Sequence, residues 1–475
     1  MLLGYLPPAL VLLAFLLWGN LLPPLAALLL DDRLARPLDR GISWRDGRPL
    51  FGPHKTIRGI LASLLGCTST APLFGLDWRT AATAAILLLA GDLCSSFIKR
   101  RLGHRSGDAV LGLDQFLEGL LPGLYLGPHL HIPTGQVLFS LALFVPLAHA
   151  GACFWKTQLC APPAADYPRI LRSTVRLREW RSCHQPLARW HAWFNLSSIL
   201  YNKVVVGVFF RLLVLYQQGV ENALRVEVHE QDIACPTLPP TFDGFTILLL
   251  TDLHLDGLPS LRDIILEQLG QRSFDLCLIG GDIRMETYGP IAPCLRELRR
   301  LLPEIHARHG IFGVLGNHDC IEMAPDLEEA GITMLINDNC RLEQEQAVLW
   351  LVGVDDPHYY QTHDLPHAFR SVQPDGFSIL LAHSPEAYRE AAAHGASLYL
   401  CGHTHGGQIC LPNTTPIYTN SRAPRFTARG LWRHQTMQGY TSRGVGVSGA
   451  PLRFNCPGEI TILTLRKSEN PAQYA

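Results

Sequence analysis

The sequence predicts a two-part chain, in which an N-terminal all-α polytopic membrane domain of about five spans precedes a C-terminal α/β domain. Apolar residues make up 48% of the chain and charged residues 17%, against about 25% charged residues in ordinary soluble domains. Long apolar stretches fill the N-terminal part, whereas short runs rich in β-branched residues alternate with helical patterns in the C-terminal part. We expect a membrane domain over residues 1–155, a basic linker over 156–240 and the α/β domain over 241–467.

The first element is an apolar segment over residues 1–30 that contains no charged side chain. At about 1.5 Å per residue it is long enough to cross a hydrocarbon core of about 30 Å. Similar stretches follow at residues 59–75, 80–98, 109–127 and 135–154. Basic side chains gather after the first, third and fifth stretches, so the positive-inside rule puts these connections on the cytoplasmic side. We therefore expect a multi-pass protein of the inner (cytoplasmic) membrane whose C-terminal domain is cytoplasmic.

The end of the linker, residues 192–216, is apolar and long enough to cross the membrane. It also contains Lys203 and Arg211, and a charge at mid-span costs about 2.5 to 3.5 kcal/mol. This composition favours an amphipathic helix on the membrane surface. A further span remains the alternative, and it would reverse the side of the C-terminal domain.

Buried strands are the next predicted elements. The candidate runs are residues 245–250, 274–279, 310–315, 348–354, 378–382 and 397–400. Helical patterns over 260–270 and 292–308 lie between them. This alternation is typical of an α/β domain with strands covered on both faces.

Polar side chains follow five of these runs directly, and open α/β sheets place their ligand sites at the carboxyl ends of strands. The side chains are Asp252, His254, Asp282, Asn317, His318, Asp319, His383, His403 and His405. Carboxylate, imidazole and amide oxygen together suit Mn²⁺, Fe or Zn²⁺. Residues 241–475 carry 18 basic and 26 acidic side chains, a net charge of −8, which argues against a nucleic-acid partner. Bound dications would supply the positive charge that a phosphate ligand needs.

The order of these blocks, D-x-H (252–254), G-D (281–282), G-N-H-D (316–319), H (383) and G-H-x-H (402–405), resembles the calcineurin-like metallophosphoesterases. The resemblance implies a four-layer αββα sandwich with two divalent metal ions. It assigns the first ion to Asp252, His254, Asp282 and His405, and the second to Asp282, Asn317, His383 and His403. It implies that His318 is the general acid and that Asp319 orients it.

The stretch Ser442–Gly446 before the last strand resembles the membrane-associated bacterial branch of that superfamily. This resemblance implies hydrolysis of a phosphomonoester, phosphodiester or pyrophosphate bond in a phospholipid or a nucleotide-linked lipid. The expected partners are the bilayer and a membrane lipid or lipid-linked phosphate.

Ionisable residues also occur inside the N-terminal apolar stretches, where they are costly and mark functional sites. The three acids are Asp92, Asp114 and Glu118. Asp114 and Glu118 lie four residues apart on one face of a helix and are candidates to share a Mg²⁺ ion. Basic side chains suited to binding a nucleotide triphosphate lie near them. These are Lys55, Arg58, Lys99 and Arg100.

The segments FGPHKTIRG (51–59), GDLCSSFIKRRLG (91–103) and LDQFLEG (113–119) resemble the CDP-archaeol synthase family over roughly residues 1–155. The resemblance implies transfer from CTP, with Mg²⁺, to a lipid phosphate to make a CDP-lipid. The family pattern D-Q-x-D is altered, because Leu117 stands where the second acid is expected and the acid follows as Glu118. Two alternatives stay open for this part: a cytidylyltransferase to which the phosphoesterase domain is accessory, or a non-catalytic lipid-phosphate-binding anchor.

Overall fold

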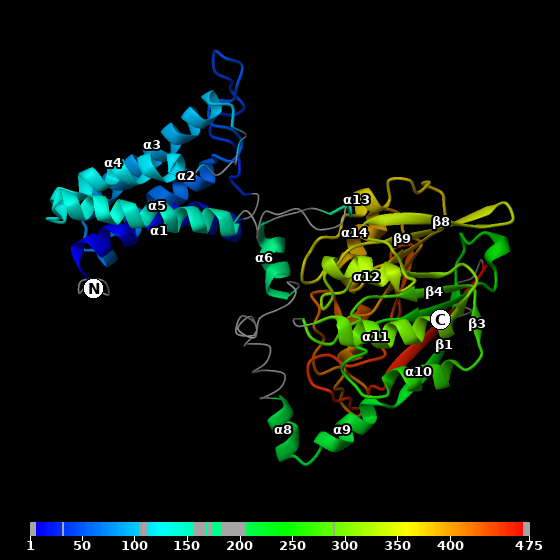
Figure 1. Cartoon of the computed structure of the whole chain (residues 1–475). Coiled ribbons are helices and arrows are strands. Elements are labelled where there is room, and N and C mark those ends of the chain that lie inside the picture. Colours follow the sequence, from blue (N-terminus) through cyan, green and yellow to red (C-terminus); the bar gives the residue numbers. More distant parts are fainter. Residues whose placement is uncertain are drawn as a thin grey trace. The chain divides into compact units, whose positions relative to one another are not determined.

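The computed structural model of the chain describes residues 6–30, 33–104, 106, 110, 112–155, 167–169, 173–182, 206–287 and 290–468. The chain forms two compact units (Figure 1). Unit 1 comprises Met1–Ala161 and Arg172–Leu177, and unit 2 comprises Pro162–Leu171 and Arg178–Ala475.

Unit 1 is helical. Its main helices are α1 (Pro8–Leu30), α2 (Ile57–Ser69), α3 (Trp78–Arg101), α4 (Leu113–His129) and α5 (Thr134–Phe154). Asp77 caps α3 by accepting hydrogen bonds from the first free backbone N–H groups of that helix. Gly91 lets α3 and α4 touch, because a Cβ atom there would lie 2.2 Å from the carbonyl oxygen of Leu117. Phe15 and Phe144 are fully buried between the helices and form part of the unit's core.

Three of these helices are long and apolar enough to cross a membrane. Among the described residues, α1, α3 and α5 meet that description with 23, 24 and 21 residues. The helices α2 and α4 have 13 and 17 residues, and α4 also carries Asp114 and Glu118. The helical, apolar character of unit 1 is therefore confirmed, whereas the expected count of about five spans is not.

Unit 2 contains two mixed six-stranded sheets. The first has the order β1-β14-β2-β4-β6-β7, with β1 Val226–Ala234, β14 Gly458–Arg466, β2 Thr246–Leu250, β4 Leu276–Ile279, β6 Ile311–Gly313 and β7 Thr333–Met334. The second has the order β12-β13-β11-β10-β9-β8, with β12 Gly430–His434, β13 Met437–Thr441, β11 Leu398–Cys401, β10 Ser378–Leu381, β9 Ala347–Gly353 and β8 Asp338–Gln344. A small pair, β3 (Ser273–Phe274) and β5 (His306–Ala307), completes the strands described.

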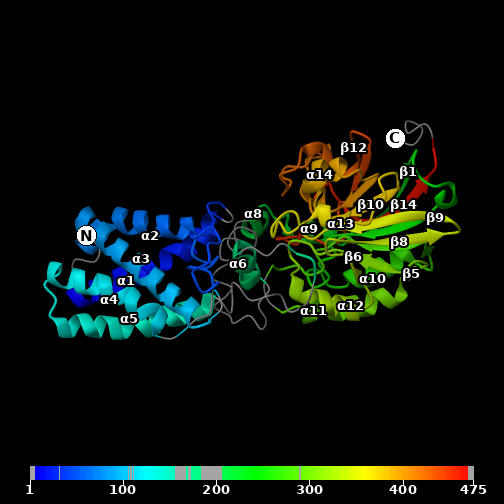
Figure 2. The ribbon, with the colours of Figure 1, turned by 90° about the horizontal axis from the view of Figure 1, so that it is seen from above.

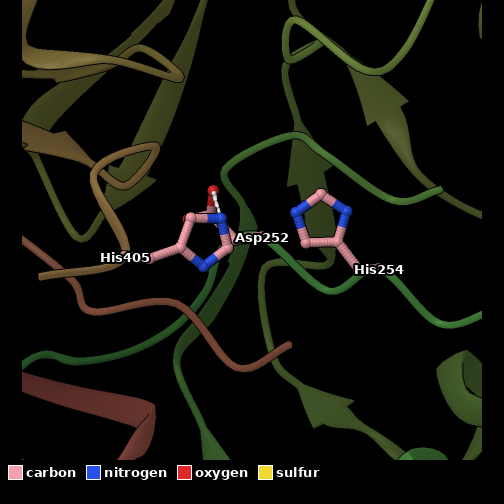
Figure 3. A group of neighbouring side chains, drawn as sticks. All are labelled: Asp252, His254 and His405. Carbon is pink, nitrogen blue, oxygen red and sulfur yellow. Dashed lines mark ion pairs between the residues drawn. The ribbon is translucent and has the colours of Figure 1, made fainter. Parts of the chain in front are cut away.

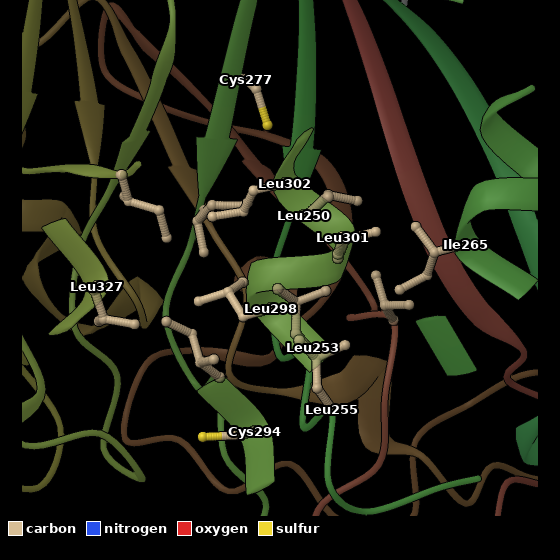
Figure 4. Close-up of a cluster of buried hydrophobic side chains, with 14 of the residues drawn as sticks. Leu250, Leu253, Leu255, Ile265, Cys277, Cys294, Leu298, Leu301, Leu302 and Leu327 are labelled. Atoms are coloured by element: carbon tan, nitrogen blue, oxygen red, sulfur yellow. The ribbon is translucent and has the colours of Figure 1, made fainter. Parts of the chain in front are cut away.

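Helices cover the outer faces of both sheets, which gives the expected four layers (Figure 2). These helices are α10 (Leu261–Leu269), α11 (Ala292–Leu301) and α12 (Ala324–Glu329) on the first sheet, and α13 (Leu365–Ala368) and α14 (Tyr388–Ala393) on the second. Alternate residues of β2 point to opposite sides. Leu248 and Leu250 meet α10 and α11 in one core (Figure 4), while Ile247 and Leu249 face the second sheet in another.

The structure corrects the predicted helix over 292–308. The helix α11 ends at Leu301, and a short 3-10 turn over Leu302–Glu304 follows. Pro303 explains the break, since proline has no N–H to donate and clashes with the preceding helical turn. Residues His306–Ala307 then form β5 instead of continuing the helix.

Part of the predicted linker over 156–240 belongs to the first sheet of unit 2. Strand β1 pairs in parallel with β14 along its whole length, from Val226 with Gly458 to Ala234 with Arg466. The first sheet therefore begins before residue 241.

The predicted membrane-surface helix over 192–216 is only partly visible, because residues 192–205 lie outside the described part of the chain. The next described elements are a short helix, α8 (Gly207–Leu212), and a second one, α9 (Tyr216–Ala223). They are separated at Val214, whose φ is +57°.

The segment before β1 also supplies buried ion pairs to unit 2. Arg169 binds Glu179 of α6 (Ser173–Ser182) and donates from Nε to Asp355 at 2.5 Å. All three side chains are almost completely buried. A buried ion pair of this kind is costly to break by removing one partner, so these residues belong to the folded core of unit 2.

Candidate metal centre

Five strands of unit 2 deliver the predicted polar side chains. In the first sheet β2, β4 and β6 are parallel neighbours, and in the second β10 and β11 are parallel neighbours. Their carboxyl ends lead into the five motif loops, as predicted from the sequence. The structure brings all nine of the predicted polar residues into this one region, most of them buried.

The first cluster consists of Asp252, His254 and His405, whose ligand atoms all lie within 4.8 Å of one another (Figure 3). Nε2 of His405 is 3.4 Å from Oδ1 of Asp252, the contact dashed in Figure 3. Nε2 of His254 and Nε2 of His405 are buried and have no hydrogen-bond partner among the described residues. Buried polar atoms of native proteins normally have a partner, so a cation between these imidazoles and the carboxylate accounts for both.

The second cluster consists of Asp282, His383 and His403, again within 4.8 Å. Nε2 of His383 lies 3.4 Å from Oδ2 of Asp282, 2.9 Å from Oδ1 of Asn317 and 3.2 Å from Nδ1 of His403. Oδ2 of Asp282 also lies 3.7 Å from Nε2 of His254, a member of the first cluster. Asp282 is thus the carboxylate between the two clusters.

Backbone carbonyls fix the far nitrogens of these imidazoles. Nδ1 of His254 lies 2.7 Å from the oxygen of Arg284, and Nδ1 of His383 lies 2.8 Å from the oxygen of Gly280. Such hydrogen bonds set the tautomer and ring orientation of metal-binding histidines. They leave Nε2 of each ring directed at the carboxylates.

The loops hold several of these residues in the left-handed backbone region, which is unusual for residues other than glycine. The values of φ are +52° for Asp252, +41° for His254, +55° for Asp282, +71° for His403 and +49° for His405. Glycines nearby make room for the carboxylates: a Cβ atom at Gly316 would lie 2.2 Å from Oδ1 of Asp282, and one at Gly402 would lie 2.2 Å from Oδ2 of Asp252. Strain of this kind is found where function requires one side-chain arrangement.

His318 lies beside the first cluster without joining its three-membered group. Its Nε2 is 3.8 Å from Oδ2 of Asp282 and 3.3 Å from Oγ of Ser448. Its Nδ1 contacts the carbonyl oxygen of Met285. The ring therefore presents Nε2 toward the space beside Asp282.

The predicted orienting role of Asp319 stays a prediction, and the structure shows which groups its carboxylate contacts. The carboxylate of Asp319 is fully buried and accepts hydrogen bonds from the backbone N–H groups of Ile283 and Gly316, at 2.9 and 3.0 Å. It braces the two loops that carry Asp282 and His318. The carbonyl of Met285, 33 residues earlier in the chain, is the group that holds His318.

Proton equilibria in the centre show strong electrostatic coupling. Burial raises the pKa of Asp252 to about 6, with a further contribution from the neighbouring Asp282. Burial opposes the charge on His383 too, but Asp282 and Asp252 outweigh it and raise the pKa of His383 to about 10. Burial lowers the pKa of His254 to about 3, and repulsion from His318 adds to the effect. The acids and imidazoles of the centre therefore influence one another's protonation strongly, with His383 favoured as its protonated form beside Asp282.

Sequence reasoning missed His358, which is not among the predicted site residues. Nδ1 of His358 is 2.7 Å from Oε1 of Glu386, and its ring centroid is 4.1 Å from that of His403. His358 follows strand β9 as the other ligands follow their strands, so the strand-end rule applied to residues 348–354 would have found it. Arg284 and Ser448 were missed as well, and no local sequence signal marks them.

The polar residues of unit 1 form separate pairs. Lys55 binds Asp92 and Lys99 binds Asp114, both at 2.5 Å, and Oε1 of Glu118 accepts from Nδ2 of Asn20 at 2.8 Å. Among the residues described for unit 1, no three carboxylates, imidazoles or thiols come within 4.8 Å of one another. The predicted sharing of one ion by Asp114 and Glu118 thus gains no support.

The structure also shows the surroundings of the two predicted arginines of unit 1, Arg58 and Arg100. Nε and Nη1 of Arg58 are buried without a hydrogen-bond partner in the described residues. The side chain lines a cavity of about 750 Å³ between apolar residues of α1 and α2. Arg100 is buried near the end of α3.

Comparison with known proteins agrees with this division of the chain. Residues 245–407 match the family described as calcineurin-like phosphoesterase, and residues 10–160 match CDP-archaeol synthase. An uncharacterized metallophosphoesterase of Helicobacter pylori is 31% identical over 279 residues, covering 56% of this chain and 71% of that protein. Phosphodiesterase YaeI of Escherichia coli is 31% identical over 235 residues, covering 46% and 82%. CDP-archaeol synthase of Thermococcus gammatolerans is 42% identical over 133 residues, covering 25% and 76%.

The motif order, the four layers and these matches agree on the C-terminal part, and the helical unit agrees with the N-terminal match. The chain therefore belongs to the calcineurin-like phosphoesterase family through its C-terminal part and to the CDP-archaeol synthase family through its N-terminal part.

Proposed function

We propose that this membrane protein hydrolyses a phosphoester or pyrophosphate bond of a membrane lipid or nucleotide-linked lipid at two divalent metal ions held by unit 2. The observation that carries the proposal is the pair of ligand clusters with Asp282 between them. Both clusters fit a cation. In the first, Nε2 of His254 and Nε2 of His405 are buried and have no hydrogen-bond partner among the described residues. In the second, the ligand atoms of Asp282, His383 and His403 lie within 4.8 Å of one another.

Asp252, His254, Asp282 and His405 would hold the first ion, and Asp282, Asn317, His383 and His403 the second. The donor set of oxygen and imidazole nitrogen suits Mn²⁺, Fe or Zn²⁺. Two such ions would neutralise phosphate charge and lower the pKa of water from about 15.7 to about 7.

The chain's own residues supply the remaining chemistry. His318 holds Nε2 toward the space beside Asp282, fixed from behind by the carbonyl of Met285, and is placed to give a proton to the leaving oxygen. Asp319 keeps the loop of His318 against the loop of Asp282. The buried loops exclude water from the sides of the site, which strengthens every charge interaction in it.

A lipid substrate is supported by the fusion of this unit to apolar helices long enough to cross a membrane. The distribution of basic residues supports the inner membrane as its location and a cytoplasmic position for unit 2. The proposed substrate class is therefore a phosphorylated membrane lipid.

The test uses the full chain purified in detergent, stripped with a chelator and reloaded separately with Mn²⁺, Fe²⁺ or Zn²⁺. Reloaded protein should hydrolyse bis-p-nitrophenyl phosphate, and Asp282→Asn, which keeps the size of the side chain, should abolish turnover and lower the bound metal. Asp263→Asn is the matched control, since Asp263 is 61% exposed and pairs only with surface Arg262 in the described structure. Equal turnover in wild type and Asp282→Asn would overturn the proposal.

A second candidate function belongs to unit 1 and is favoured by half-buried Arg58, which lines an apolar cavity and whose Nε and Nη1 have no hydrogen-bond partner among the described residues. An arginine in that position is suited to a lipid phosphate whose chains occupy the cavity. If unit 1 is a cytidylyltransferase, membranes containing the chain should make CDP-lipid from CTP and Mg²⁺, and Asp114→Ala should prevent it. Saturable binding of a lipid phosphate without CTP turnover would leave the anchoring role.

A further inference from the structure

Exposed apolar side chains are unevenly distributed over unit 2. Among its described residues, every large apolar side chain that is exposed lies in one of two segments, 208–214 and 411–426. The most exposed are Val214 at 87% and Leu212 at 78%, with Tyr418 at 66% and Ile417 at 57%. We call these two segments together the apolar rim. Clustered exposed apolar surface marks an interaction site.

The two parts of the rim are physically connected. The ring of Phe210 stacks on that of Phe454 at a centroid distance of 5.1 Å. The carbonyl of Phe454 accepts a hydrogen bond from the backbone N–H of Cys410 at 2.9 Å, directly before the second segment. The rim is therefore one continuous feature built on the loop that carries Phe454.

The rim also borders the metal centre on two sides. On one side, Arg211 of the first segment lines a cavity of about 280 Å³ together with Met285, whose carbonyl holds His318. On the other side, the carbonyl of Asn420 in the second segment contacts Nε2 of His403. The first segment is thus next to the residue that holds His318, and the second contacts a member of the second cluster.

The charge of the rim is opposite to that of the rest of the unit. No acidic residue occurs between Glu390 and Glu459, and this interval contains six arginines, although residues 241–475 have a net charge of −8. Arg211, Arg422 and Arg425 are exposed within the rim. Arginines interspersed with exposed apolar side chains are typical of protein surfaces that enter the interfacial layer of an anionic bilayer.

The backbone conformation of Val214 also supports an interaction at the rim. It is a β-branched residue with φ of +57°, a backbone region that such side chains rarely adopt. The turn nevertheless projects this apolar side chain into solvent. A strained, exposed apolar tip is explained when a nonpolar phase receives it.

We propose that the apolar rim inserts into the interfacial layer of an anionic phospholipid bilayer and that lipid phosphates enter the metal centre along it, past Arg211. The entry route rests on the proposed function, whereas the membrane contact does not. The guanidinium of Arg211 stacks on the ring of Tyr216 at 4.3 Å. Its N–H groups have no hydrogen-bond partner among the described residues, so they can donate to a lipid phosphate.

The membrane contact is tested by photo-crosslinking in the full chain, reconstituted in nanodiscs of phosphatidylcholine with tritiated phosphatidylglycerol. The photoreactive residue p-benzoylphenylalanine replaces Leu212, Val214 or Ile417 in turn. The control position is exposed Glu345 in the turn between β8 and β9, which Figures 1 and 2 show at the opposite end of unit 2 from α8. All four positions are exposed, so these variants should fold.

Label should attach at the three rim positions at least about fivefold more than at Glu345, as expected for contact with lipid. Equal labelling at rim and control positions would overturn the proposal, and so would crosslinks from the rim to protein in place of lipid. This readout requires no turnover. A protein that is inactive but still crosslinks to lipid at the rim would therefore refute the proposed function and leave the membrane contact standing.

The entry route is tested by the double substitution Leu212→Gln/Val214→Gln. The ratio of kcat/KM for a phospholipid in vesicles to kcat/KM for bis-p-nitrophenyl phosphate should fall by about tenfold, because the apolar contact with the bilayer is weakened. Leu102→Gln, a substitution of an exposed leucine in unit 1, is the matched control and should leave the ratio unchanged. An unchanged ratio in the double variant would overturn the entry route.

Discussion

Replacement of Arg284 by alanine should destabilise unit 2 and impair catalysis together. Arg284 is 1% exposed. Its Nε donates to the carbonyl of His318 at 2.6 Å and its Nη2 donates to the carbonyl of Ser182 in α6 at 2.7 Å. Its own carbonyl accepts from Nδ1 of His254 at 2.7 Å. The side chain of Arg284 thus ties the segment before β1 to the loop of the predicted general acid, and its backbone carbonyl holds the predicted ligand His254.

The size of the effect depends on the acceptors that lose their donor. The side chain of Arg284 serves the carbonyls of His318 and Ser182, and that of Thr287 at 3.3 Å. A buried polar group left unsatisfied costs about 1 to 3 kcal/mol, so three carbonyls at the lower end amount to about 3 kcal/mol. For a unit as long as unit 2, that loss corresponds to a fall in Tm of about 5 °C. Displacement of His318 should also lower kcat more than it raises KM.

The assay is thermal unfolding of the full chain in detergent, followed by near-ultraviolet circular dichroism, with kcat measured on bis-p-nitrophenyl phosphate. Arg284→Lys retains the charge but loses the planar guanidinium group with its several N–H donors. Its Tm should therefore lie between that of wild type and that of Arg284→Ala. Arg262→Ala is the control, because Arg262 forms ion pairs at the surface that contribute little. A Tm for Arg284→Ala equal to that of Arg262→Ala, with kcat unchanged, would refute the assignment of Arg284 as a positioning residue.

Three further predictions concern other parts of the chain. His318→Asn should lower kcat by about 10²- to 10⁴-fold without reducing the metal content found by elemental analysis; loss of the metal would make His318 a ligand. Burial alone would raise the pKa of Glu459, but Arg443 and neighbouring hydroxyls lower it below its usual value. Glu459 therefore stabilises the fold at neutral pH and loses this effect as the pH falls through its folded pKa, so between about pH 5 and about pH 3 the Tm of wild type should fall more steeply than that of Glu459→Gln, and parallel curves would contradict this. Gly91→Ala should reduce the yield of monodisperse protein in size-exclusion chromatography, because a Cβ would lie 2.2 Å from the α4 backbone, whereas Gly151→Ala, with no atom within 4 Å, should not; equal yields would show that α3 and α4 can separate.

Much of the metal centre was predictable because its chemistry is local to strand ends. The run predicted at 245–250 became β2 over Thr246–Leu250, and Asp252 and His254 follow it directly. A buried strand is recognised by its apolar residues, and the residues after it must lie at the edge of the sheet. The same reasoning located the histidines after β10 and β11.

Other features depend on residues far apart in the chain and have no local signal. The parallel pairing of β1 with β14 joins Val226 to Gly458, which no periodicity in either segment reveals. The contact of His318 with the carbonyl of Met285 likewise depends on how two loops cross. The contacts of Asp319 with the backbone N–H groups of Ile283 and Gly316 also depend on that crossing, and the family resemblance did not indicate them.

The sequence by itself determined the division into an apolar helical unit and an α/β unit, and the identity of the side chains available to bind metal. Those properties depend on composition and on the short-range periodicity of buried residues. Only the tertiary structure decided which of these side chains meet, with Asp282 between two clusters and a strained turn at Val214 beside an arginine-rich loop. Convergence of that kind depends on the pairing order of the strands and on backbone conformations that close packing imposes, and neither is encoded in any one segment of the chain.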